Sequence, residues 1–203
     1  MVQATHLILN GSYGSPDANW SPWLKKELEG RDETVLAPQF QADDWDKATT
    51  AGKENFVPTH QTLENWLKTF NEIIPLLDTD NLTVIAHSLA PLFVLHVLHK
   101  NPTLQIKNAL FVAPFLGKIG DIWQIEAVNK SFYAPNDFDF KDFASRIQRS
   151  HVFYSDNDPY VPTAESLGFT QKLNSKTHLV KDAGHFNTDS GYSTFSSILN
   201  FII

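Results

Sequence analysis

The stretch Leu82-Thr83-Val84-Ile85-Ala86-His87-Ser88-Leu89-Ala90 joins a short β-branched run to a serine that lies between small residues. Val84 and Ile85 are typical of a buried strand. The amphipathic segment 89–100, which follows directly, predicts a helix. Ser88 is therefore expected to lie on a tight turn between a strand and a helix.

A serine in this position matches the motif called a nucleophile elbow. The motif is usually written G-x-S-x-G, because side chains two residues before and after the serine would collide in so tight a turn. In this chain the two positions are Ala86 and Ala90. Alanine is the next smallest residue, so the steric requirement can still be met. The alternative is that Ser88 is an ordinary helix N-cap, and the pentapeptide alone leaves both interpretations open.

Strand and helix patterns alternate along the whole chain, which predicts an α/β fold with a mostly parallel sheet of about six strands and helices on both faces. Ser21 followed by Pro22 predicts a helix start with Ser21 as the N-cap. Besides the run before Ser88, strands are predicted at 5–9, 33–36, 106–113, 151–155 and 177–181. Besides the helix at 89–100, helices are predicted at 21–29, 59–77, 140–147, 163–173 and 192–203.

Two segments show no clean period. Residues 39–58 are polar and are interpreted as a long surface loop, and residues 115–142 are an aromatic-rich irregular insertion and a candidate small cap.

The chain has 203 residues, 42% of them hydrophobic. That is enough for one well-buried core and too little for two full-sized domains, so we expect a single domain over 1–203.

Charge and composition exclude several classes of partner. The formal net charge is −7, with both signs scattered, so we expect neither nucleic acid nor a membrane surface as a partner. The absence of cysteine excludes a thiol nucleophile, disulfides and thiolate metal sites. Residues 1–6 lack the features of a signal peptide, and no apolar run approaches the roughly 20 residues that span a bilayer. A cytoplasmic protein is expected.

The segments that follow the predicted strands carry the chemistry, because functional groups gather beyond the carboxyl ends of a parallel sheet. The first strand is followed by Asn10-Gly11-Ser12-Tyr13-Gly14 and the third by Ser88. The fifth is followed by Asp156-Asn157-Asp158 and the sixth by Ala183-Gly184-His185-Phe186. Serine, acid and histidine occur in the chain order of the α/β-hydrolase triad.

These residue types fit one reaction. A serine hydroxyl becomes a strong nucleophile when a histidine accepts its proton, and a carboxylate fixes the tautomer of that histidine. Negative charge on the substrate oxygen then needs preorganised N–H donors. The candidates are the backbone N–H of Leu89 and that of Ser12 or Tyr13. The sequence does not reveal which amide of the Gly11–Tyr13 loop points inward.

From Leu7 to the C-terminus the chain resembles the small α/β-hydrolase family that includes retinoblastoma-binding protein nine and its bacterial serine hydrolase relatives. The resemblance implies an α/β-hydrolase fold with Ser88 as nucleophile, Asp158 as triad acid and His185 as base. Four separated blocks carry it in the right order, namely 10–14 with Trp20 and 23–28, then 87–89, 155–162 and 183–186.

Two points stay open beside the resemblance. Ala86 and Ala90 stand where the family usually has glycines, and the loop from 40 to 58 is longer than in the relatives. Asp156 competes with Asp158 for the acid role, and either aspartate could instead cap the following turn. The spacing to Pro162 in the family favours Asp158.

Cofactor and metal interpretations find little support. His96 and His99 are three residues apart on a predicted helix, but no carboxylate with suitable spacing accompanies them. Gly11-Ser12-Tyr13-Gly14 follows a strand, yet it forms neither G-x-G-x-x-G nor a Walker lysine pattern. We therefore expect no cofactor and no metal.

Two functions are consistent with the sequence. The first is a carboxylesterase-like serine hydrolase that cleaves carboxylic esters or related small acyl substrates through an acyl-enzyme on Ser88. The alternative is a catalytically weak α/β-hydrolase-fold protein that acts as a protein-interaction module. Its motivation is the alanine pair Ala86 and Ala90, together with the family's association with protein binding, so a protein partner is expected by family analogy only.

Overall fold

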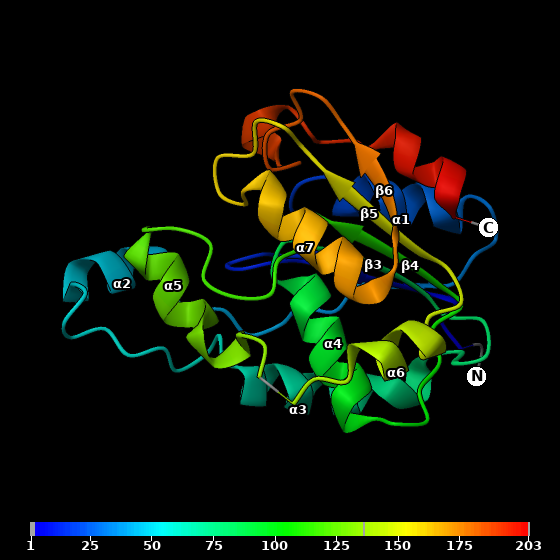
Figure 1. Cartoon of the computed structure of the whole chain (residues 1–203), viewed down its shortest axis with the longest axis horizontal. Helices are drawn as coiled ribbons and strands as arrows, with labels where there is room; N and C mark the ends of the chain where they lie inside the picture. Colours follow the sequence, from blue (N-terminus) through cyan, green and yellow to red (C-terminus); the bar gives the residue numbers. More distant parts are fainter. Residues whose placement is uncertain (1–2, 136, 203) are drawn as a thin grey trace.

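The computed structural model describes residues 3–135 and 137–202. Within them, six parallel strands form one sheet in the order β2-β1-β3-β4-β5-β6, with helices on both faces (Figure 1). This confirms the predicted α/β class and the mostly parallel sheet. The strands are β1 (His6–Leu9), β2 (Val35–Leu36), β3 (Thr83–His87), β4 (Asn108–Val112), β5 (Ser150–Tyr154) and β6 (Lys176–Leu179).

The helices divide between the two faces of the sheet. α1 lies on one face with the C-terminal 3-10 segment η4, and α3, α4, α6 and α7 lie on the other (Figure 1). None of the helices in the described residues is long and apolar enough to cross a membrane. The bounds are α1 (Ser21–Glu29), α2 (Trp45–Ala51), α3 (Leu63–Ile73), α4 (Ala90–Lys100), α5 (Trp123–Asn129), α6 (Phe140–Arg146), α7 (Thr163–Leu173) and η4 (Ser196–Phe201).

The centre of the core is the unit formed by β3 and α4. Every residue of β3 is buried, and so is every residue of α4 from Ala90 to Leu98. A helix that is apolar all round needs cover on all sides, which the sheet and its neighbours α3 and α6 provide. The turn between β3 and α4 therefore joins two buried elements of the core.

The two segments without a clean period are partly helical, which corrects the loop predicted at 39–58. This segment contains α2, whose N-cap Asp44 accepts a hydrogen bond from the Lys47 N–H at 2.9 Å. The insertion 115–142 contains α5, which packs against α2, and the two helices project beyond the end of the sheet (Figure 1). Because each helix has only seven residues, neither is long enough to produce a convincing apolar period.

Aromatic stacking fixes both segments to the body of the protein. Phe40 stacks on Trp66 of α3 with ring centroids 4.8 Å apart, and Phe132 meets the same indole edge-on at 4.9 Å. Phe93 of α4 completes the cluster, 5.3 Å from Trp66. The projecting end is therefore connected to α3 and α4 by large buried rings.

Two local predictions were wrong. The segment 192–203 was expected to be a helix, but its described residues form only the short η4, because the run Ser193-Thr194-Phe195-Ser196-Ser197 has low helix propensity. Ser21 was expected to be an N-cap, yet the N-cap of α1 is Trp20. The Ser21 hydroxyl instead donates to Asn10 Oδ1 at 2.7 Å, in the buried start of the loop after β1.

Candidate active site

Ser88 lies on the turn between β3 and α4 with a φ of +62°, in the left-handed region that non-glycine residues rarely adopt. Its N–H donates to the Val112 carbonyl at 2.8 Å, which ties the turn to β4. Ala86 and Ala90 are both fully buried beside it. The Ser88 side chain makes no capping hydrogen bond to α4, whose N-cap is Leu89. The elbow therefore forms with alanine at both flanking positions, and Ser88 is not an ordinary helix cap.

The structure brings Ser88, His185 and Asp158 into one hydrogen-bonded row. His185 Nε2 lies 3.0 Å from Ser88 Oγ, and His185 Nδ1 lies 2.8 Å from Asp158 Oδ2. The side chain of Asp158 is only 2% exposed. Its second oxygen, Oδ1, accepts the N–H groups of Tyr160 and Val161 at 2.8 and 3.0 Å. The carboxylate is thus held from both sides, with one oxygen facing the imidazole.

Asp156, which the sequence left as a rival for the acid position, lies elsewhere. Its Oδ1 accepts the N–H of Asp182 at 2.9 Å and so links the loop after β5 to the loop after β6. Of the two aspartates, Asp158 is the one whose carboxylate reaches His185.

The loop that carries His185 is fastened at several points. Gly184 has a φ of +53°, and a Cβ there would lie 2.2 Å from Ser190 Oγ, so a larger residue would not fit. The Gly184 N–H donates to Asn157 Oδ1 at 2.7 Å. The indole N–H of Trp20, a residue matched by the family resemblance, donates to the Phe186 carbonyl at 2.9 Å. These contacts fix the backbone on both sides of the histidine.

His87, directly before the serine, holds the same loop through a hydrogen bond. Its Nε2 lies 2.8 Å from the His185 carbonyl oxygen, and since that oxygen can only accept, Nε2 carries the proton. Burial lowers the pKa of His87 to about 3, and the neighbouring His185 adds to this effect. His87 is therefore a neutral donor that fixes the backbone of His185.

Acidification below pH 6.5 is expected to weaken the fold partly through His87. In the unfolded chain His87 takes up a proton near its ordinary pKa of 6.5, whereas in the folded protein its pKa is about 3. Between these values the unfolded state binds more protons, so this contribution is complete above pH 6.5 and is lost as the pH falls. As the pH is lowered across this range, the urea unfolding midpoint of His87→Gln should fall less steeply than that of the wild type. The glutamine keeps an amide donor but does not titrate. An identical slope in both proteins would contradict this assignment.

The N–H of Leu89, directly after the serine, has no acceptor within the described residues, and neither do the N–H groups of Gly11 and Ser12 in the loop after β1. The Tyr13 N–H, also predicted as a candidate, donates to Gln61 Oε1 at 2.8 Å. The loop passes very close to the serine, because a Cβ on Gly11 would lie 2.5 Å from Ser88 Cβ and 3.0 Å from Ser88 Oγ.

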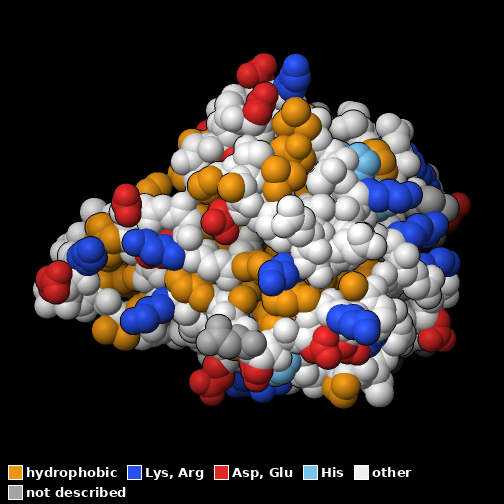
Figure 2. Space-filling model, viewed as in Figure 1, with side chains coloured by type: hydrophobic (Ala, Val, Ile, Leu, Met, Phe, Trp, Pro, Cys, Tyr) orange, Lys and Arg blue, Asp and Glu red, His pale blue; other side chains and the backbone are white. Residues whose placement is uncertain are grey.

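A cavity of about 460 Å³ opens in front of Ser88 and His185. None of the described residues in its lining is lysine or arginine. Figure 2 shows hydrophobic side chains at the projecting end formed by α2 and α5, interspersed with basic and acidic ones. The apolar and aromatic lining residues are Tyr13, Trp45, Ile119, Ile122, Ile125 and Tyr160, and the uncharged polar or acidic ones away from the serine are Asn19, Asn129, Asn187 and Asp189.

The sheet is parallel, and the serine lies on an elbow between a strand and a helix. A loop that carries the acid and a loop that carries the histidine follow it in the chain. Together these features define an α/β-hydrolase fold. The chain belongs to the serine hydrolase family, whose model matches residues 6–202. This confirms the resemblance drawn from the sequence. No curated protein matches the chain.

Several solved structures share the fold. The ydeN gene product from B. subtilis has a TM-score of 0.77 and 22% identity, over 100% of this chain and 97% of that one. A putative YdeN-like hydrolase from Pectobacterium atrosepticum has a TM-score of 0.60 and 19% identity, over 98% and 88%. A structure from work on carboxylesterases of the thaumarchaeon Nitrososphaera gargenis has a TM-score of 0.64 and 7% identity, over 97% and 87%.

Proposed function

We propose that this protein is a carboxylesterase-like serine hydrolase that needs no cofactor and forms an acyl-enzyme on Ser88. The observation that carries the proposal is the row of hydrogen bonds from Ser88 Oγ to His185 Nε2 and from His185 Nδ1 to Asp158 Oδ2. The Ser88 hydroxyl donates to His185, and the His185 Nδ1–H donates to the carboxylate. This arrangement matches what acyl transfer by a serine requires.

In the first half-reaction His185 Nε2 takes the Ser88 proton as Oγ attacks the substrate carbonyl, and the C–O π electrons move onto the carbonyl oxygen. The tetrahedral intermediate collapses when the bond to the leaving alcohol breaks and His185 gives that alcohol the proton. In the second half-reaction His185 takes a proton from water, which attacks the acyl carbon. Ser88 then leaves with its proton restored and the carboxylic acid is released. Asp158 stabilises the imidazolium in both halves.

The N–H groups of Leu89 and Ser12 are the proposed oxyanion donors. Leu89 directly follows the nucleophile and Ser12 lines the cavity in front of it, and neither N–H has another acceptor within the described residues. Tyr13 is less suitable, because its N–H already donates to Gln61. A preorganised donor is most effective when it does not have to break another hydrogen bond first.

The lining of the cavity favours neutral substrates with an apolar group. Its volume of about 460 Å³ suits a small molecule, and Ile119, Ile122 and Ile125 provide an apolar wall. Asp189 is the acidic residue at the cavity away from the triad, and no basic side chain among the described lining residues offsets it. A substrate that carries its own carboxylate would therefore be repelled.

The test compares two esters with acyl chains of equal length, p-nitrophenyl butyrate and p-nitrophenyl hemisuccinate. We expect the neutral butyrate to be hydrolysed with a kcat/KM about fivefold higher, because a carboxylate close to the exposed Asp189 loses about 1 kcal/mol. Asp189→Asn should reduce the ratio between the kcat/KM values of the two esters without lowering kcat for the butyrate ester. Acid quenching should trap a butyryl group on Ser88, detected by peptide mass spectrometry. A folded protein that hydrolyses neither ester would contradict the proposal.

The interaction-module alternative has two motives, the alanine pair Ala86 and Ala90 and the family's association with protein binding. The first is weakened because the elbow of Ser88 is formed with both alanines in place. A protein partner stays an expectation from family analogy.

A further inference from the structure

Two buried amides, Gln61 and Asn129, meet behind the loop that carries the proposed oxyanion donor. Gln61 precedes α3 and Asn129 ends α5, and both are 0% exposed. Gln61 Oε1 lies 2.8 Å from the Tyr13 nitrogen, and Asn129 Oδ1 lies 2.6 Å from Ser12 Oγ. Gln61 Nε2 lies 3.1 Å from Asn129 Oδ1, which joins the two contacts into one network.

The direction of every hydrogen bond in this network follows from its backbone end. The N–H of Tyr13 can only donate, so the oxygen of Gln61 faces it and Nε2 must point the other way. Since Nε2 can only donate, the atom of Asn129 that faces it is Oδ1, and Oδ1 then also accepts the Ser12 hydroxyl proton. Neither amide can be turned over without placing two donors or two acceptors against each other.

Gln61 is itself held by a buried carboxylate. Asp43 Oδ2 accepts the N–H of Gln61 at 2.9 Å, and Oδ1 accepts the N–H of Thr59 at 3.1 Å. Burial alone would raise the pKa of Asp43, but the backbone N–H groups of Gln61, Thr59 and His60 lower it below its ordinary value. The carboxylate is therefore ionised at neutral pH, and it fixes the backbone from which the Gln61 side chain extends.

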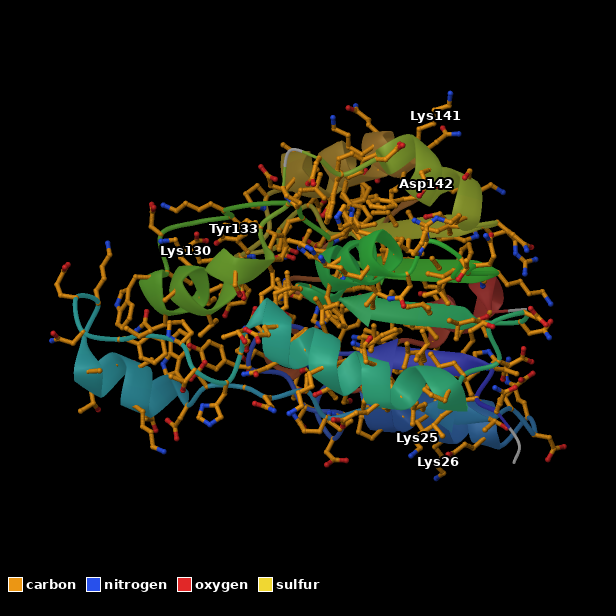
Figure 3. The ribbon with its side chains drawn as sticks, turned by 90° about the horizontal axis from the view of Figure 1, so that it is seen from below. Lys25, Lys26, Lys130, Tyr133, Lys141 and Asp142 are labelled. Carbon is orange, nitrogen blue, oxygen red and sulfur yellow. The ribbon has the colours of Figure 1, made fainter. Side chains whose placement is uncertain are left out.

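Asn129 belongs to the insertion 115–142, at the end of α5. Directly after α5, the chain turns through η2 (Lys130–Phe132), where Figure 3 labels Lys130 and Tyr133. The Tyr133 hydroxyl donates to Glu126 on α5. Asn129 Nδ2 has no hydrogen-bond partner within the described residues although it is buried. Such an unpaired donor costs stability, on the order of 1–3 kcal/mol. Packing therefore explains an asparagine at this position poorly. The hydrogen bonds that its Oδ1 accepts from Ser12 and Gln61 explain it better.

The loop needs an external constraint. Tyr13 has a φ of +54°, which is unfavourable for a non-glycine residue, and Gly11 passes against Ser88 with no space for a Cβ. The network ties Ser12 through its side chain and Tyr13 through its N–H. The peptide group after the Ser12 Cα is thereby fixed through the Tyr13 N–H. The peptide group before it, which carries the Ser12 N–H, is held at its other end because the Gly11 carbonyl accepts the Gly14 N–H at 3.0 Å.

We propose that Gln61 and Asn129 are positioning residues that hold the Ser12 N–H toward the oxyanion. The inference rests on the proposed function. It also links the insertion 115–142, which contributes Asn129, to the segment directly before α3, which contributes Gln61, through their contacts with the loop after β1.

The test substitutes Gln61→Met, which keeps the length of the side chain and removes both polar atoms. We expect kcat to fall by about 10²-fold with little change in KM, since a displaced donor weakens the transition state more than the bound substrate. Gln61→Glu keeps the acceptor for Tyr13 and should recover part of the loss. Gln171→Met, on the exposed side of α7, is the matched control and should behave as wild type.

A second readout separates positioning from general damage. Butylboronic acid forms a tetrahedral anion on Ser88, whereas butyrate, the product, does not. In Gln61→Met, affinity for the boronic acid should fall by the same factor as kcat/KM, and affinity for butyrate should be unchanged. Ser12→Ala, which retains the Ser12 N–H and removes its tether to Asn129, should show the same pattern and covers the case in which Gln61→Met does not fold.

Equal losses of boronic acid and butyrate affinity, or wild-type kinetics in Gln61→Met and Ser12→Ala, would overturn the positioning role while leaving the esterase proposal intact. A wild-type protein that neither hydrolyses butyrate esters nor binds the boronic acid would instead overturn the proposed function, and with it this inference.

Discussion

Replacing Asp158 by asparagine should lower kcat/KM by about 10⁴-fold while the fold survives. The oxygen of the introduced amide can still accept the N–H groups of Tyr160 and Val161, as Asp158 Oδ1 does now. The amide NH₂ would then face His185 Nδ1, where Asp158 Oδ2 now lies at 2.8 Å. Nδ1 would have to accept, so Nε2 would carry the proton and could no longer take one from Ser88.

Asp156→Asn is the matched control, because it makes the same chemical change two residues away. The oxygen of the introduced amide can keep the contact with the Asp182 N–H, and neither atom of it reaches the imidazole. Activity should stay near that of the wild type. Thermal denaturation of both variants should show that each is folded. If Asp156→Asn were the inactive variant and Asp158→Asn the active one, the assignment of the acid would be wrong.

Gly11→Ala should reduce activity by at least about 10²-fold, because the added methyl group meets the nucleophile itself. The new Cβ would lie 2.5 Å from Ser88 Cβ and 3.0 Å from both Ser88 Oγ and the His87 carbonyl. These neighbours belong to the rigid elbow, so the loop after β1 must move and take the Ser12 N–H with it. Overpacking of this kind also costs about 1–3 kcal/mol of stability.

Gly117→Ala provides the comparison for Gly11→Ala, since a Cβ on Gly117 would have no atom within 4 Å. It should leave ester hydrolysis and the unfolding midpoint close to wild type. Steady-state kinetics and urea unfolding measure both variants together. Wild-type kcat in Gly11→Ala would show that the loop does not pass as close to Ser88 as the structure places it.

The parts of the site that the sequence predicted are those set by local pattern and chain order. Val84 and Ile85 mark a strand, the apolar run after Ser88 marks a helix, and the tight turn between them follows directly. Alternating elements imply a parallel sheet, whose carboxyl ends lie at one edge. Ser88 and His185, 97 residues apart in the chain, could therefore be expected to meet.

The alanine pair could not be judged from sequence. Whether Ala86 and Ala90 fit depends on what surrounds the turn, and Gly11, from a distant loop, is one of the residues that leaves space next to Ser88. The choice between Asp156 and Asp158 likewise depended on which carboxylate the loop turns toward His185. Family spacing favoured Asp158, whereas the residues alone left both open.

Gln61 and Asn129 were missed because no local signal marks them. They are 68 residues apart. Gln61 is a polar residue near the start of the predicted helix 59–77, and Asn129 lies in the aromatic-rich insertion. Their function depends on contacts with Ser12 and Tyr13. A lone Gln before a helix and a lone Asn at a helix end are also common as surface residues. Complete burial of both amides is the signal, and it exists only in three dimensions.

The central claim is that Ser88 is an activated nucleophile, and labelling with a fluorescent fluorophosphonate tests it most directly. The reagent reacts with serines whose proton is taken by a neighbouring base. We expect the wild type to carry one label, mapped to Ser88 by peptide mass spectrometry, and Ser88→Ala to carry none. A folded wild type that stays unlabelled, or equal labelling of Ser88→Ala, would contradict the account.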